Sequence, residues 1–419
     1  MSVVNVETLI IGGGQAGLAM SEHLSKREKP HLIVERHRIA ERWRSERWDS
    51  LVANGPAWHD RFPNKTFSID PNGFATKDQI VDYFVAYAEQ IAAPIRTGVE
   101  VTALYSKAEG SGFRAETSEG VIEAANVVVA TGPFQRPIIP TVVPAESGIE
   151  QIHSANYRNP AQLRDGAVLV VGAGSSGVQI ADEVVCAGRR VYLSVGPHNR
   201  PPRRYRGRDF VWWLGVLGEW DRKVVAPDTE HVTIAVSGAR GGHTVDFRHL
   251  AARGVTLLGR TCGYKDGVMQ FAPDLAKNIA QGDAHYQSVL RAADAYVGQK
   301  RIDLPEEAQA HQIGPDPQCV AHPLFQLNLA QAGVTSIVWA TGYALDFGWI
   351  KVNAFDEKGR PVHQRGVSDL PGLYFLGLSW LSRRASAFIW GVWHDADYLA
   401  SHIAARNADP VSNAAPNSD

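Results

Sequence analysis

Short runs of consecutive apolar residues, each followed by a glycine-rich turn and an amphipathic stretch, mark the first half of the chain. The first run is 8–11, followed by the turn 12–17, and the second is 168–171, followed by the turn 172–177. Because both runs are continuously apolar and rich in β-branched residues, they predict buried parallel strands. The amphipathic stretches that follow, to about Arg27 and Ala187, predict helices. The pattern therefore predicts two βαβ units in an α/β protein.

Both turns have the spacing Gly-x-Gly-x-x-Gly. In such a turn the first glycine permits the sharp exit from the strand. The second lets backbone N–H groups approach a pyrophosphate, and the third lets the helix pack closely on the sheet. The strand–turn–helix context makes both turns candidate dinucleotide sites. The predicted contacts are Gly12, Gly14, Gln15, Ala16 and Gly17 in the first turn, and Gly172, Gly174, Ser175, Ser176 and Gly177 in the second.

The two units differ where their second strand ends. The first ends in Glu35, beside Arg36, and an acid at this place accepts hydrogen bonds from an unphosphorylated ribose, which favours FAD. The second ends in Ser194 without an acid, and a cluster of arginines follows. Arginine forks suit a 2′-phosphate, so we expect NADPH there, although a solvated basic loop is the alternative interpretation. The arginines assigned to the coenzyme are Arg200, Arg203 and Arg204.

Two further buried strands both end in Ala-Thr-Gly, where small residues let the chain pass close to a bound dinucleotide. These triplets are Ala130-Thr131-Gly132 and Ala340-Thr341-Gly342. They predict two Rossmann-like domains, with the NADPH-binding domain inserted in the FAD-binding domain. We expect the FAD-binding domain to begin with residues 1–160, the NADPH-binding domain to span 161–330, the FAD-binding domain to resume over 331–405, and a flexible tail to cover 406–419.

Composition narrows the class of protein. The net charge is −2. Binding to nucleic acid or to an anionic membrane needs a basic surface, and a chain with this charge balance gives no indication of one. The three cysteines form no CxxC pair, so the sequence does not indicate a dithiol disulfide reductase. So few cysteines suggest a reducing compartment. No signal peptide or membrane-length apolar run is found, so we expect a cytoplasmic protein. The 15 histidines show no metal-ligand spacing; His59 and His394 are candidate pocket residues.

These features together resemble the class B flavin-dependent monooxygenases, which include the mammalian-type flavin monooxygenases, the plant YUCCA enzymes and bacterial relatives. The segment 130–137 resembles their ATGxxxxP linker, and 340–343 resembles their late ATGY. The segment 372–377, which ends in Gly377, resembles their FAD-closing strand, and Trp43, Arg44 and Trp48 lie in a stretch resembling the one that passes the flavin. The segment 54–56 resembles the one whose asparagine faces the isoalloxazine ring.

Two departures from the family pattern stand out. The fingerprint FxGxxxHxxxY keeps only its second half, His153 and Tyr157, because Ser147 and Ile149 replace the phenylalanine and the glycine. The glycine pair that usually precedes the tryptophan at position 43 is replaced by 40–41, Ala-Glu.

The resemblance implies an NADPH- and O2-dependent monooxygenase that oxygenates a soft N or S atom of a small organic substrate. NADPH would reduce FAD, and O2 would add at flavin C4a to give a hydroperoxide. Asn54 is the candidate that stabilises this adduct, since an amide donates and accepts without titrating; an Asn-Gly-Pro turn is the alternative.

Several questions stay open from the sequence. Baeyer–Villiger or 2-oxo-acid decarboxylating chemistry, or a non-oxygenating NADPH-dependent flavin reductase, would need the same cofactors. The aromatic segment 210–220, with Phe388, Trp390 and Trp393, lines a substrate channel or belongs to the core. The expected partners are a small-molecule substrate and O2, and a homodimer is left open.

Overall fold

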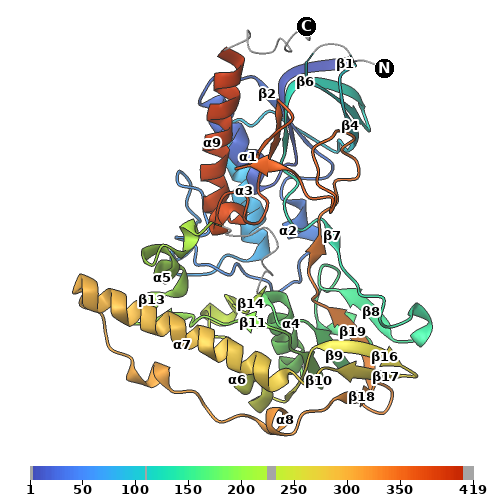
Figure 1. Ribbon diagram of the computed structural model, residues 1–419, viewed down its shortest axis with the longest axis vertical. Helices are drawn as coiled ribbons and strands as arrows, with labels where there is room; N and C mark the ends of the chain where they lie inside the picture. The colour runs from blue at the N-terminus through green and yellow to red at the C-terminus, as the bar shows by residue number, and fades with distance from the viewer. Residues whose placement is uncertain (1–2, 109–110, 224–232, 409–419) are drawn as a thin grey trace.

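The computed structural model describes residues 3–108, 111–223 and 233–408. Two α/β units follow one another along the long axis, with the start of β1 and the end of α9 at the far end of the first unit (Figure 1). In the described residues the first unit has a nine-stranded sheet whose main path is β21-β22-β23-β6-β1-β2-β3. Its strands are β1 (Val3–Ile11), β2 (His31–Glu35), β3 (Ile95–Thr97), β4 (Val101–Ser106), β5 (Phe113–Thr117), β6 (Gly120–Val129), β21 (His363–Gln364), β22 (Val367–Ser368) and β23 (Leu373–Phe375).

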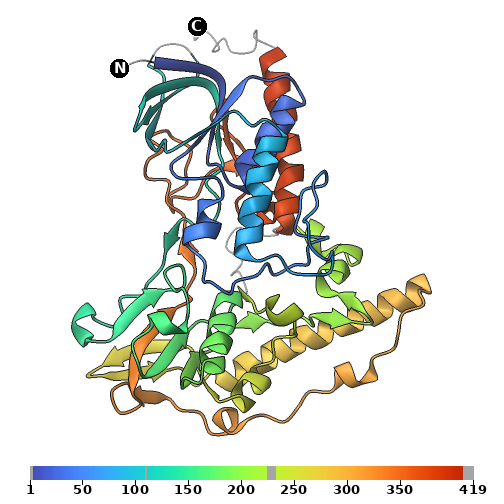
Figure 2. The same cartoon turned by 180° about the vertical axis from the view of Figure 1, so that it is seen from behind.

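Helices α1 (Gln15–Ser25), α3 (Lys77–Gln90) and α9 (Ile389–Ala408) lie side by side against this sheet (Figure 2). The short α2 (Glu41–Ser45) follows β2. Strands β23, β6, β1, β2 and β3 run parallel, and the continuously apolar residues of β1 and β6 lie in the core. Helix α9 continues to Ala408, into the segment predicted as a flexible tail; residues 409–419 lie outside the described ones.

The second unit has a five-stranded parallel sheet in the order β15-β10-β9-β19-β8. These strands are β8 (Glu150–His153), β9 (Ala167–Val171), β10 (Val191–Ser194), β15 (Val255–Leu258) and β19 (Val334–Trp339). An antiparallel sheet of β16 (Thr261–Lys265), β17 (Val268–Phe271) and β18 (Gln326–Asn328) accompanies it. The helices are α4 (Ser175–Cys186), α5 (Phe210–Val216), α6 (Phe247–Ala252), α7 (Leu275–Lys300) and α8 (Gln318–Ala321). Two short ribbons pair β11 (His198–Asn199) with β14 (Thr233–Ile234) and β12 (Arg204–Tyr205) with β13 (Arg208–Asp209).

The second unit is inserted in the first, but strand pairing moves both boundaries predicted from the sequence. The sequence assigned residues up to 160 to the first unit and returned to it at 331. Strands β8 and β19 instead pair with each other and with β9 in the second sheet. The chain therefore crosses between the units at β7 (Arg136–Pro137) and β20 (Tyr343–Ala344), which pair with each other. The reason is that parallel pairing, rather than linker composition, decides which sheet a strand joins.

The two glycine turns have the same geometry. Gly12 and Gly172 both have positive φ, 118° and 120°. A Cβ on Gly17 would overlap the carbonyl oxygen of Gly12, and a Cβ on Gly177 would overlap that of Gly172. Only glycine therefore lets each helix start so close to its strand.

Burial of His198 makes the stability of the fold depend on pH. Burial lowers the pKa of His198 to about 4. Its Nδ1 hydrogen-bonds the carbonyl of Gly196 at 3.0 Å, its ring lies 4.3 Å from that of Phe247, and its Nε2 is buried without a partner. Since the pKa of His198 is lower in the folded than in the unfolded chain, the unfolded state binds the proton first as pH falls.

We predict that His198 costs the folded state about 2 kcal/mol when the pH falls from 7.5 to 5, a range that spans the ordinary histidine pKa. His198→Phe should weaken the pH dependence of the free energy of unfolding by about that amount, measured by urea denaturation at both pH values. The exposed His322, replaced by phenylalanine, is the matched control. An unchanged pH dependence in His198→Phe contradicts the assignment.

Candidate functional site

A cavity of about 790 Å³ lies between the two units, and both glycine turns line it. Most of the residues predicted to bind the cofactors also line it. They are Gly12, Gly14, Gln15, Ala16, Glu35, Arg36, Trp43, Trp48, Ala130, Thr131, Gly132, Gly174, Ser175, Ser176, Ala340, Gly342 and Gly377, together with the candidate catalytic residue Asn54. The predicted residues that do not line it are Gly17, Arg44, Gly172, Gly177, Ser194, Arg200, Arg203, Arg204 and Thr341.

The helices that follow the two turns begin without a side-chain cap. Helix α1 follows Gly14 and α4 follows Gly174, and neither has an acidic residue in its first turn. Of the other helices, α3, α5 and α6 are capped by the side chains of Thr76, Asp209 and Asp246, whereas α2, α7 and α8 also lack a side-chain cap but do not follow a glycine turn. Uncapped N-terminal N–H groups at the positive end of a helix dipole favour an anion. The two turns that line the cavity therefore fit the pyrophosphate of a dinucleotide.

The ends of β2 and β10 differ as the sequence indicates. Glu35 lines the cavity, and its carboxylate accepts hydrogen bonds from the backbone N–H groups of Gly13 at 2.7 Å and His37 at 2.9 Å. It is therefore held rigidly where a ribose can reach it. Ser194 is buried, and its hydroxyl donates to the carbonyl of Gly259 at 3.0 Å. The second unit therefore presents no acid at this place.

The second turn is covered by the chain itself. Nothing lies within 4 Å of a Cβ built on Gly14, whereas one built on Gly174 would overlap the methyl group of Thr233 in β14. The hydroxyl of Ser175 donates to the carbonyl of Ile234 at 2.9 Å. The first turn is thus open to the cavity, while the second shares its space with β14.

The structure does not bring the predicted 2′-phosphate arginines into the cavity. Arg200 is 2% exposed and its Nε donates to Asp283 at 3.0 Å; Arg203 is 3% exposed and its Nε donates to Asp209 at 3.0 Å. Both charges are therefore paired inside the second unit. Arg204 is exposed and donates to the carbonyl of Gly241 at 3.1 Å. The sequence could not reveal these carboxylate partners in advance, because Asp283 lies in α7, far along the chain.

Asn54 lies on the cavity wall with its side chain oriented by the second unit. Its Oδ1 accepts a hydrogen bond from Nε2 of Gln179 at 2.9 Å, and Nε2 also donates to the carbonyl of Val236 at 2.8 Å. The backbone carbonyl of Asn54 accepts from Arg203 at 2.6 Å. Because Oδ1 is engaged, the amide NH2 group is the portion of Asn54 available to a ligand. Arg203 therefore stabilises the turn that contains Asn54.

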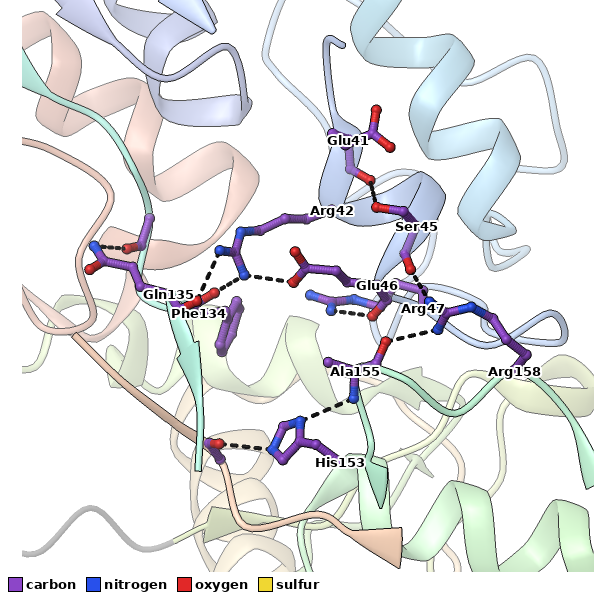
Figure 3. A network of polar contacts seen from close by, with 12 residues as sticks. Glu41, Arg42, Ser45, Glu46, Arg47, Phe134, Gln135, His153, Ala155 and Arg158 are labelled. Carbon is purple, nitrogen blue, oxygen red and sulfur yellow. Dashed lines mark hydrogen bonds and ion pairs between the residues drawn. The ribbon is translucent and has the colours of Figure 1, made fainter. Parts of the chain in front are cut away.

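A polar network joins the two units next to the cavity (Figure 3). Arg42 of α2 pairs with Glu46 at 2.7 Å and donates to the carbonyls of Phe134 and Gln135 in the crossing segment. Arg158 of the second unit donates to the carbonyl of Ser45. The network therefore fixes α2 to the crossing segment and to the second unit.

The retained half of the fingerprint contributes to the same junction. Nε2 of His153 hydrogen-bonds the carbonyl of Gly342 at 3.0 Å, and its Nδ1 accepts from the N–H of Ala155 at 3.1 Å. Burial lowers the pKa of His153, which keeps the ring neutral as this pairing requires. The hydroxyl of Tyr157 donates to Glu183 at 2.7 Å, and Glu183 also accepts from Ser50 of the first unit at 2.7 Å.

Arg47 also lines the cavity, although it was not among the residues predicted to bind a cofactor. Its guanidinium lies 5.4 Å from the ring centroid of Trp43 and 5.7 Å from that of Phe134, and burial lowers its pKa. Its Nη1 donates to the backbone carbonyl of Glu46 at 2.8 Å, and the ion pairs found among the described residues do not include Arg47. The signal was present in the sequence, because Arg47 directly precedes Trp48 in the stretch assigned to the flavin.

The aromatic segment 210–220 divides between cavity and core. Phe210, Val211, Leu214 and Trp220 line the cavity, whereas Trp212 and Trp213 pack against residues of α7. Near the C-terminus, Phe388 lines the cavity but Trp390 and Trp393 do not. Of the two candidate pocket histidines, His59 lines the cavity and His394 does not. The core interpretation therefore applies to Trp212 and Trp213, and a substrate channel stays a prediction for the residues that line the cavity.

Comparison with known proteins places the chain in a family. Residues 9–208 match the family described as pyridine nucleotide-disulphide oxidoreductase. An uncharacterized oxidoreductase CzcO-like from Geobacillus kaustophilus is 35% identical over 403 residues, which cover 95% of this chain and 98% of that relative. The chain belongs to the family of CzcO-like oxidoreductases.

Wider likeness confirms the resemblance to the class B flavin monooxygenases, whose members use FAD and NADPH. A probable indole-3-pyruvate monooxygenase, YUCCA1 from Arabidopsis thaliana, is 32% identical over 182 residues, 42% of this chain and 44% of that relative. A flavin-containing monooxygenase from Stenotrophomonas maltophilia superposes with a TM-score of 0.66 at 18% identity, over 96% of this chain and 99% of that one. The fold is therefore that of the flavin monooxygenases, and the chain is an oxidoreductase.

Membrane-spanning and metal-binding features are both absent from the described residues. None of the helices in the described ranges is long and apolar enough to cross a membrane. In the same ranges, no group of three or more His, Cys, Asp and Glu residues is placed to hold a metal ion.

We predict that Arg203→Met lowers the free energy of unfolding by about 3 kcal/mol, because it leaves the buried Asp209 carboxylate without its partner. Adding Asp209→Asn, which retains a side-chain cap for α5, should recover some of the loss in a double-mutant cycle measured by urea denaturation. If Arg203→Met leaves stability unchanged and weakens only the affinity for NADPH, Arg203 contacts the coenzyme instead.

Proposed function

We propose that the chain is an NADPH- and O2-dependent flavoprotein monooxygenase that oxygenates a soft N or S atom of a small organic molecule. The observation that carries this proposal is one cavity lined by both glycine turns, each followed by a helix without a side-chain cap. One cavity shared by two dinucleotide sites is what hydride transfer between their reactive ends requires.

The first turn fits FAD, and the second, with β14 over it, would hold NADPH. When bound, FAD would supply hydride acceptance and oxygen activation. The residues of the chain would bind and orient the cofactors: the N–H groups at the start of α1 face the pyrophosphate, and Glu35 accepts from the ribose. Arg47, which lines the cavity without a carboxylate partner among the described residues, would offer positive charge to an anionic group of coenzyme or substrate.

Other chemistries with the same cofactors are weaker candidates. All three cysteines lie among the described residues and none of them lines the cavity, so no thiol is placed for a disulfide reductase. Baeyer–Villiger enzymes typically carry tryptophan at the position of Tyr157, which disfavours that chemistry here. The side chain of Tyr157 is buried, and its hydroxyl donates to Glu183. Baeyer–Villiger or 2-oxo-acid decarboxylating chemistry remains the alternative, with a non-oxygenating flavin reductase as the third. Oxygen consumption driven by NADPH, scored over a substrate panel against the uncoupled background, separates them.

We predict that NADPH is preferred over NADH by tenfold to a hundredfold in kcat/KM, because a charge-assisted contact to a 2′-phosphate contributes about 1.5–3 kcal/mol. Steady-state oxidation of both coenzymes measures it. Equal kcat/KM values for the two coenzymes contradict the prediction.

We also predict that Asn54→Ala diverts NADPH oxidation from substrate oxygenation to hydrogen peroxide. The available NH2 group of Asn54 is the preorganised donor, and losing such a donor costs about 3 kcal/mol, or roughly a hundredfold in the ratio of oxygenated product to peroxide. FAD content and flavin reduction should stay nearly constant, because neither step needs this contact. The control is Asn72→Ala, at an exposed position away from the cavity. An unchanged peroxide yield in Asn54→Ala would show that Asn54 only shapes the turn and does not contact the flavin.

A further inference from the structure

One end of the cavity is an aromatic wall, which we define as Trp58, His59, Trp220, Phe388 and Trp390. The ring of His59 stacks on that of Trp220 with centroids 5.2 Å apart and 25° between their planes. Trp58 and Trp390 meet the His59 ring edge-on, each at 5.5 Å. Phe388 meets Trp220 edge-on at 5.0 Å. His59, Trp220 and Phe388 line the cavity. This wall therefore offers flat apolar surface with one imidazole in it.

His59 is held by a carboxylate that is itself fixed to the flavin-facing turn. Nδ1 of His59 lies 2.7 Å from Oδ1 of Asp60, and Oδ2 of Asp60 accepts from the N–H of Gly55 at 2.9 Å. Gly55 follows Asn54, and a Cβ on it would overlap the Asp60 carboxylate. The imidazole, the carboxylate and the Asn54 turn therefore form one rigid unit.

This arrangement decides what Nε2 of His59 can do. A carboxylate only accepts hydrogen bonds, so when the His59 ring is neutral its Nδ1 carries the proton and its Nε2 presents a lone pair. The His59 side chain is 8% exposed, and Nε2 is buried without a hydrogen-bond partner. A buried acceptor without a partner is costly, and it is commonly retained where a ligand supplies the partner.

The wall also has charged neighbours. Arg384 lines the cavity, lies 5.8 Å from the Trp220 ring centroid and donates to Glu219 at 3.0 Å, and Glu219 accepts from Arg222 at 3.0 Å as well. The Asp60 carboxylate is held against Nδ1 of His59. A ligand against the wall therefore meets an aromatic surface and one acceptor, Nε2 of His59. These features favour an aromatic molecule that carries a hydrogen-bond donor.

We propose that His59 determines substrate specificity: its Nε2 accepts a hydrogen bond from an N–H or O–H group of an aromatic substrate that lies against Trp220 and Phe388. Asp60 acts as a positioning residue by fixing the tautomer of His59. The inference names the substrate class of the proposed monooxygenase site and so rests on that proposed function.

The test is equilibrium binding to the purified protein with its flavin, measured by isothermal titration calorimetry without NADPH. The probes are 4-methylphenol, which donates a hydrogen bond, and 4-methylanisole, which has the same ring and cannot donate. The wild-type protein should bind the phenol about tenfold more tightly, the scale of one buried hydrogen bond. His59→Phe should bind both probes alike, and His322→Phe, at an exposed position, should retain the preference. Equal affinities in the wild-type protein, or a preference retained in His59→Phe, overturn the proposal.

Asp60→Asn supplies a second readout that a purely structural role would not produce. The oxygen of the new amide must face the N–H of Gly55, so its NH2 group faces Nδ1 of His59 and moves the ring proton to Nε2. The site should then favour the acceptor 4-methylbenzaldehyde over 4-methylphenol by about tenfold relative to the wild-type protein. A preference that does not move in Asp60→Asn contradicts the tautomer assignment and with it the proposal.

Failure of the inference and failure of the proposed function give different results. Binding discrimination needs neither NADPH nor O2. A protein that discriminates between the probes but consumes no O2 with NADPH refutes the monooxygenase proposal alone. A protein that consumes O2 with NADPH but binds the probes equally refutes the role of His59 alone.

Discussion

The close contact between the start of each helix and the end of the strand before it is the constraint on which the rest of the structure depends. Gly17 of α1 lies against the carbonyl of Gly12, and Gly177 of α4 lies against that of Gly172, so tightly that no side chain fits at either helix position. This contact brings the uncapped N-terminus of each helix to the end of its strand. Because the two units repeat it, the protein has two places prepared for a pyrophosphate.

The second requirement is that the two prepared places line one cavity, the first openly and the second beside β14. Arg42, Arg158 and His153 tie α2, the crossing segments and the second unit together. Arg203 and Gln179 of the second unit hold the Asn54 turn of the first. The polar contacts between the units therefore do not merely connect them. They set the position of the residues that would face the flavin.

The sequence predicted the features that short segments encode by themselves. The strand–turn–helix pattern, the Ala-Thr-Gly strand ends and Glu35 all depend on neighbours within one βαβ unit. The features it missed depend on distant partners. Arg200 and Arg203 follow β10 as coenzyme arginines would, but Asp283 of α7 and Asp209 neutralise them. The domain boundaries moved for the same reason, since β8 and β19 are assigned by pairing across the chain. The role proposed for His59 likewise needs Trp220 and Phe388, which come from remote segments.

The most direct measurement of the central claim is the identity and stoichiometry of the flavin released by heat from the purified protein. One open turn with an uncapped helix and Glu35 predicts FAD, a dinucleotide, at one molecule per chain. The protein should be yellow as purified or after reconstitution with FAD. A colourless protein that takes up no FAD, or one that retains a flavin mononucleotide lacking the second phosphate and ribose, would contradict the account.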